Sequence, residues 1–137
     1  VSDVEYEASK EPDRNIILYG NRRTNRLWKS LLADSPVQVD EGVVEFQGRA
    51  YEGKNISCIF VRPRAGSATA SVGVVSGTGL EGMRLSNIVR YLEPGLGLPD
   101  LTVFSSDVLT KGDAGILLSG FFGLDWSAAG GEFVGGK

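Results

Sequence analysis

Three glycines are the residues of this chain whose spacing most suggests chemistry. Gly77, Gly79 and Gly82 form a G-x-G-x-x-G pattern between the apolar run 70–75 and a helical pattern that begins at Gly82. Asp107 follows the next apolar run, 101–104. In a dinucleotide site, such glycines let the backbone approach a pyrophosphate, and the acid binds the ribose hydroxyls. The pattern therefore raises the hypothesis of a nucleotide site.

Two features weaken that hypothesis. The motif usually follows the first strand of its domain, whereas at least three strands are expected before Gly77, and the chain is too short for a second mononucleotide-binding half. The alternative is a glycine turn that packs the helix tightly on the sheet, and we favour it. An anion at the start of this helix remains a further alternative.

Basic residues follow the first predicted strand, 15–19. Arg22, Arg23, Arg26 and Lys29 lie within eight positions of one another. If that strand is parallel to run 70–75, the loops that follow both strands share one sheet edge, where open α/β sheets hold ligands. The candidate ligand-binding residues at this edge are Asn21, Arg22, Gly77, Thr78, Gly79 and Asp107. A solvated basic helix face is the alternative, and we favour it.

Catalytic equipment is sparse. The chain contains no histidine, the usual general base and partner of a nucleophilic serine. Ser76 has Val74 and Thr78 where a nucleophile elbow needs glycines. Cys58 is the single cysteine and lies in an apolar run, so we expect a buried, inert thiol. We predict no catalytic residue, no metal site and no cofactor.

The carboxylates of the C-terminal loops leave one weaker hypothesis open. Asp100, Asp107, Asp113 and Asp125 match no EF-hand spacing, and independent surface or capping roles are the expected ones. An enzyme that uses carboxylates alone would need two of them about 5–9 Å apart.

Composition limits the classes of partner. With 137 residues the chain fits one domain, and its formal net charge of −3 argues against binding to duplex nucleic acid. No apolar run approaches the roughly 20 residues that span a bilayer, so we predict no membrane partner.

Periodicity predicts alternating strands and helices. We expect strands at 15–19, 56–62, 70–75 and 101–104, a strand pair at 37–39 and 43–46, and helices at 25–33 and 82–93. Residues 115–122 fit a last strand or a buried helix equally well. The predicted fold is a three-layer α/β/α sandwich of Rossmann or flavodoxin type, with a mostly parallel central sheet and an added antiparallel hairpin. The predicted divisions are a linker at 1–14, an α/β domain at 15–127 and a flexible tail at 128–137.

Several longer blocks carry a family resemblance. They are 13–21 with Thr24, Asn25 and Trp28, then 60–64, 77–84, 99–104, 120–123, and Asp125 with Trp126. Over residues 13–127 the chain resembles the C-terminal domain of bacterial α/β-hydrolase proteins of prolyl-oligopeptidase type, which are described as esterases or peptidases. The resemblance implies that the catalytic serine and histidine lie upstream, in a domain that this sequence does not contain. It carries over no catalytic residue, and it suggests a periplasmic or secreted protein.

The resemblance therefore implies a non-catalytic accessory domain of a secreted serine hydrolase. Its expected role is to pack on or regulate the catalytic domain of the same polypeptide, with a homo-oligomer as a further possibility. Because the chain begins at Val1 without an initiator methionine, we expect it to be a C-terminal piece of a longer polypeptide. The alternative function is a stand-alone nucleotide or small-anion binding module that uses the loop 77–82.

Overall fold

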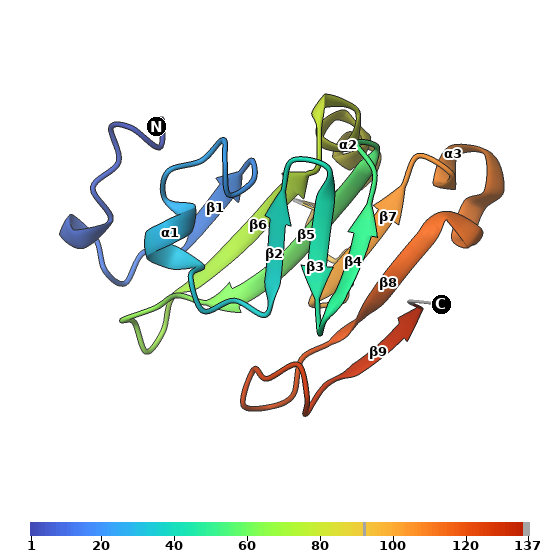
Figure 1. Ribbon diagram of the computed structural model, residues 1–137. Helices are drawn as coiled ribbons and strands as arrows, with labels where there is room; N and C mark the ends of the chain where they lie inside the picture. The colour runs from blue at the N-terminus through green and yellow to red at the C-terminus, as the bar shows by residue number, and fades with distance from the viewer. Residues whose placement is uncertain (92, 136–137) are drawn as a thin grey trace.

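The computed structural model describes residues 1–91 and 93–135 and shows two β-sheets. The larger sheet has the strand order β1-β6-β5-β7-β8-β9, and the smaller one is the meander β2-β3-β4 (Figure 1). The strands are β1 (Ile16–Tyr19), β2 (Val37–Asp40), β3 (Val43–Phe46), β4 (Arg49–Glu52), β5 (Ile56–Pro63), β6 (Ser71–Gly77), β7 (Leu101–Ser105), β8 (Ile116–Phe121) and β9 (Glu132–Gly135). The helices are short: α1 (Trp28–Leu31), α2 (Leu80–Leu85), α3 (Val108–Lys111), and the 3₁₀ turns η1 (Ala8–Lys10), η2 (Ser86–Ile88) and η3 (Gly112–Gly115).

The predicted three-layer α/β/α sandwich with a mostly parallel sheet is wrong. The structure is mostly β, with 34% of residues in strands and 18% in helices. Among the described strands, only β1 and β6 pair in parallel, whereas β5 pairs antiparallel with both β6 and β7. Strands β6 and β7 do run in the same direction across the α2 connection, but β5 lies between them. The strand-helix-strand pattern thus predicted the relative direction of β6 and β7 correctly, but the two strands are not neighbours in the sheet.

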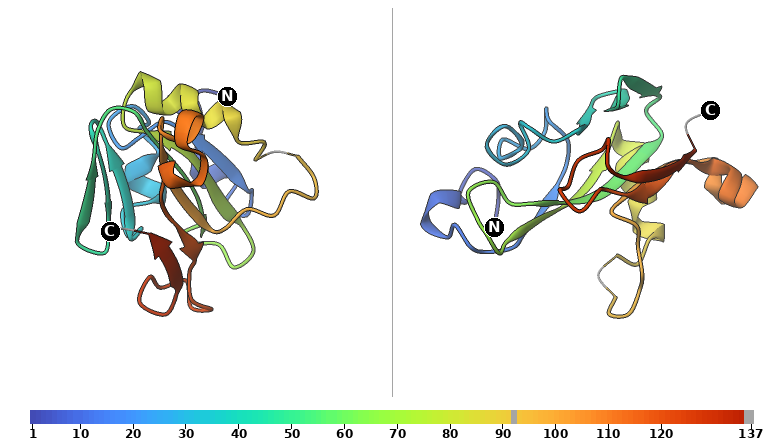
Figure 2. Two further views of the ribbon diagram at one scale, coloured as in Figure 1. Left: turned by 90° about the vertical axis from the view of Figure 1, so that its right-hand side faces the viewer. Right: turned by 90° about the horizontal axis from the view of Figure 1, so that it is seen from below.

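The core lies between the two sheets. Figure 2 shows β2, β3 and β4 as a separate layer over one face of the larger sheet. We call this covered face of the larger sheet the inner face. Val37, Val39 and Val44 alternate toward this face and are fully buried, as expected for strands with one solvated side. Trp28 of α1 packs edge-on against Phe60 of β5, with ring centroids 6.1 Å apart. Its indole Nε1–H donates to Gln38 Oε1 at 2.8 Å, so its polar edge is satisfied inside the core.

Both chain ends pack against this body. Residues 1–14, predicted as a linker, are held by Arg64, whose side chain is buried and donates to the carbonyl oxygens of Ala8, Glu11 and Arg14 at 2.6–2.7 Å. Residues 128–137, predicted as a flexible tail, contain strand β9. Phe133 of β9 stacks edge-on against Phe46 at 4.8 Å between ring centroids. This aromatic contact is a tertiary reason for a strand in a glycine-rich segment.

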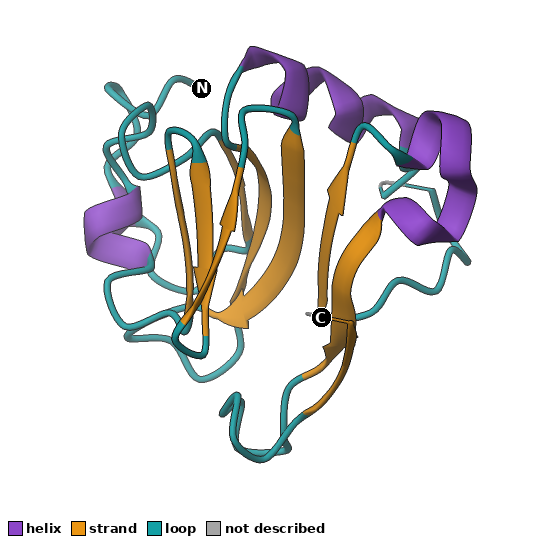
Figure 3. Ribbon diagram, turned by 45° about the vertical axis from the view of Figure 1, so that its right-hand side comes forward, coloured by secondary structure: helices purple, strands orange, loops and turns teal. Residues whose placement is uncertain are grey.

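The opposite, outer face of the larger sheet is only partly covered. The pairing register aligns Tyr19, Val75, Ile59, Thr102, Ser119 and Val134 in one row across this face. Figure 3 shows the helical segments between β6 and β7 and between β7 and β8 gathered at one end of the sheet. In this row, Tyr19 is 48% exposed and Val134 is 80% exposed. The outer face is therefore the surface where this fold leaves apolar side chains without a covering layer.

Candidate functional site

The glycine loop is packed against backbone. A Cβ atom on Gly82 would lie 2.1 Å from the carbonyl oxygen of Ile56, and one on Gly77 would lie 2.4 Å from the backbone nitrogen of Met83. At Gly79 a Cβ would lie 2.9 Å from the Lys54 carbonyl oxygen. All three positions are thus fitted to the chain itself, which allows α2 to sit directly on β5 and β6. This geometry is the tight helix packing that the sequence analysis favoured, whereas anion binding by the loop stays a prediction.

The polar residues of the loop bind the protein's own backbone. The Asn21 amide donates to the Gly77 carbonyl oxygen at 3.0 Å, and its Oδ1 accepts from the backbone N–H groups of Arg23 and Thr24. Thr78 is fully buried, and its hydroxyl accepts from the N–H of Ile56 at 3.2 Å. The structure therefore brings Asn21 to Gly77, as the parallel pairing of β1 with β6 predicts. This hydrogen bond joins the segments that follow β1 and end β6, and it uses their polar groups within the protein.

The charged candidates at this edge are paired. Arg22 donates to Asp40 Oδ2 at 2.7 Å, and Arg23 pairs with Glu41 at 3.1 Å. The hydrogen bond from Arg22 is the main cause that lowers the pKa of Asp40 below its ordinary value, and the hydrogen bond from the Glu41 backbone N–H is the second. Asp107 follows β7, which is separated from β6 by β5, and it pairs with Lys111 at 3.0 Å. Among the six candidate residues, a hydrogen bond thus joins Asn21 to Gly77, whereas Arg22 and Asp107 pair with residues outside the candidate set.

The two candidate nucleophiles, Cys58 and Ser76, are buried away from solvent. Cys58 is fully buried, and this burial raises the pKa of its thiol far above the ordinary range, so the thiol stays protonated. Ser76 is also fully buried, and its hydroxyl has no hydrogen-bond partner among the described residues. Within residues 1–91 and 93–135, no group of three or more potential metal-ligating side chains is found.

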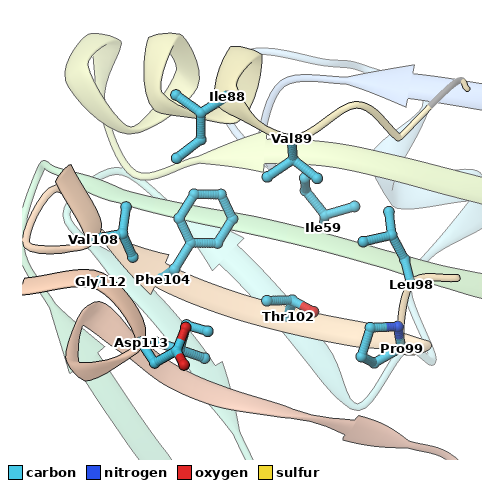
Figure 4. Close-up of a pocket in the computed structure, with 11 residues that line it drawn as sticks. Ile59, Ile88, Val89, Leu98, Pro99, Thr102, Phe104, Val108, Gly112 and Asp113 are labelled. Carbon is cyan, nitrogen blue, oxygen red and sulfur yellow. The ribbon is translucent and has the colours of Figure 1, made fainter. Parts of the chain in front are cut away.

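The outer face carries a cavity of about 280 Å³, which we call the sheet pocket. Its floor consists of Ile59, Thr102 and Phe104 from adjacent strands β5 and β7. Ile88 from η2 lies on one side and Val108 and Asp113 from the α3–η3 segment lie on the other (Figure 4). Apolar lining with a few polar groups is the usual character of a small-ligand site, and the volume is at the small end of that range.

A second depression lies between α2 and α3, and we call it the helix groove. It is lined by Leu80, Arg84, Leu85, Ile88 and Leu109, with Glu81 and Ser106. Leu80 is 68% exposed, Leu109 64% and Ile88 51%, so three large aliphatic side chains project into solvent side by side. Exposed aliphatic residues that lie together are a feature that interaction surfaces share.

Sequence reasoning missed both surfaces. Ile59, Thr102 and Phe104 belong to apolar strand runs, which predict core positions rather than a pocket floor. The available signal was the alternation of side chains along β5. If one face of a sheet packs on the core, every second residue of the strand lies on the other face, so an apolar residue there is available to line a pocket. Leu80 and Leu109 belong to helices too short for an amphipathic pattern to be informative.

Comparisons with protein-family models, with curated proteins and with solved structures find no match to this chain. Among the described residues, no helix is both long and apolar enough to cross a membrane.

Proposed function

We propose that this chain is a non-catalytic accessory domain that packs, through the helix groove, on the catalytic domain of a serine hydrolase in the same polypeptide. The observation that carries the proposal is the triplet of exposed aliphatic side chains Leu80, Ile88 and Leu109 on adjacent helical segments. Exposing such a group to water is unfavourable, and burying it contributes roughly 25 cal/mol for each Å² covered.

The charges around the groove suit a protein partner. Glu81 and Arg84 line the groove and supply one charge of each sign. An apolar centre with a polar, mixed-charge rim is the usual anatomy of a protein interface. The family resemblance supplies the identity of the partner, and the lack of histidine agrees with a catalytic centre located elsewhere.

The first test is the intact mass of the native polypeptide that carries this segment, isolated from its source cells. The proposal expects a mass several times the 14.6 kDa of this chain. The same preparation should hydrolyse a p-nitrophenyl ester, whereas the isolated chain should give the buffer rate. A native mass near 14.6 kDa, or esterase activity in the isolated chain, would contradict the proposal.

The groove itself is tested by charge insertion. In a binding assay between this chain and the separately purified hydrolase domain, the pair Leu80→Glu and Leu109→Glu should weaken association at least tenfold, because two buried carboxylates would lose hydration. The matched control is Leu124→Glu. Leu124 is fully exposed and lies outside the groove, so its substitution should leave association unchanged.

A further inference from the structure

The sheet pocket carries an inference that goes beyond the proposed docking role. Its described lining is aliphatic and aromatic, apart from the hydroxyl of Thr102 and the carboxylate of Asp113. Phe104 is buried beneath it, and Ile59 is half-buried on its floor. Water is poorly hydrogen-bonded in a cavity with this lining, so the transfer of an apolar group of matching size from water into it is favourable.

Asp113 gives the pocket a charge of one sign. It is the single charged residue among the described residues that line the cavity. Figure 4 shows its carboxylate beside the cavity, on the side of Phe104 and Val108. None of the ion pairs formed by the described residues includes Asp113, and the nearby Lys111 is bound to Asp107 at 3.0 Å. An ionised carboxylate at an apolar cavity favours a cation over a neutral or anionic group.

From this combination we infer that the sheet pocket binds a small ligand with an aliphatic body and one cationic group, the body lying on Ile59, Thr102 and Phe104 and the cation facing Asp113. The volume of about 280 Å³ limits the ligand to a compact molecule rather than a lipid or a nucleotide. The inference rests on residues of the sheet face and the α3–η3 segment, and it does not depend on Ile88, which lines both the sheet pocket and the helix groove.

Three probes of one length test the inference: hexylammonium, hexan-1-ol and hexanoate. They share an aliphatic chain and differ in the charge of the head group. Titration of the isolated chain is followed by methyl NMR shifts at Ile59 and Val108, which line the sheet pocket and not the helix groove. We expect shifts in these methyl groups and a preference for hexylammonium over hexan-1-ol of about two- to fivefold, the range that exposed ion pairs give.

Two carboxylate variants separate the local charge from the net charge. Asp113→Asn should remove the preference for hexylammonium, whereas Glu45→Gln, on strand β3 of the other sheet, makes the same change in net charge and should leave the preference intact. Ile116→Trp, at a partly exposed lining position, should block all three probes.

Four results would overturn the inference: no shifts in the pocket methyl groups with any probe, equal affinity for all three, tighter binding of hexanoate, or an unchanged preference in Asp113→Asn. None of these results bears on the helix groove, because the isolated chain is used and the groove substitutions are absent. A failed docking test would likewise leave the probe titrations unaffected.

Discussion

Replacing Gly82 by alanine is the sharpest perturbation that the fold suggests. The added Cβ would lie 2.1 Å from the carbonyl oxygen, 2.8 Å from the carbonyl carbon and 3.0 Å from the nitrogen of Ile56. All three are backbone atoms of strand β5, which is paired on both sides and cannot rotate away. Relief therefore requires α2 to move off the sheet.

The expected magnitude follows from two opposing effects. Overpacking costs about 1–3 kcal/mol, and contacts this short with fixed backbone belong to the upper end. Alanine in place of glycine favours the helix by about 1 kcal/mol. The net prediction is a loss of about 2 kcal/mol in the free energy of unfolding.

The assay is urea denaturation followed by tryptophan fluorescence, which reports on the buried Trp28 and on Trp126. The matched control is Gly97→Ala, because a Cβ at Gly97 meets no atom within 4 Å and its backbone conformation is not restricted to glycine. We expect Gly97→Ala to be neutral or stabilising by a few tenths of a kcal/mol. Equal stability of Gly82→Ala and the parent chain would refute the assignment of this glycine to helix packing.

Three further predictions concern single side chains. Arg64→Met removes the donors that hold the carbonyls of Ala8, Glu11 and Arg14, so trypsin should cleave after Arg14 many times faster than in the parent chain; an unchanged cleavage rate would contradict that role. The Cys58 thiol should react with Ellman's reagent only after unfolding, since burial raises its pKa, and rapid reaction of the native chain would count against it. Burial and the Tyr19 hydroxyl raise the pKa of Tyr91 to about 12, so absorbance at 295 nm should show a late-titrating tyrosine whose pKa falls in Tyr19→Phe. Because the folded-state pKa of Tyr91 lies above its unfolded value of 10.0, its contribution to stability should be complete below pH 10 and lost between about pH 10 and 12, and a flat stability profile there would disagree.

Local elements were largely predictable from the sequence. The strand pair at 37–39 and 43–46 is confirmed as β2 and β3, because Val37, Val39 and Val44 alternate with polar residues. The run 56–62 is confirmed as β5, and residues 116–121 form a strand rather than a buried helix. The helix predicted at 82–93 is shorter, with α2 ending at Leu85 and η2 at Ile88.

Strand neighbours and surfaces were not predictable, for physical reasons. Two strands linked by a helix run in the same direction whether or not a third strand lies between them, and the sequence does not reveal that β5 does. Strand β9 depends on the contacts of Phe133 with Phe46 and Phe122, which exist only once the sheets have assembled. In the candidate loop, the contact of Asn21 with Gly77 was predictable from parallel strands, whereas the pairing of Arg22 with Asp40 needed the position of β2.

The proposed docking buries the helix groove against a catalytic domain in the native polypeptide. Amide hydrogen exchange, compared between the isolated chain and the native polypeptide, tests it most directly. We predict slower exchange in the native polypeptide at residues 80–88 and 106–111, with unchanged exchange at 47–50, in the turn before strand β4 and its first two residues. Equal exchange at the groove in both samples would contradict the claim.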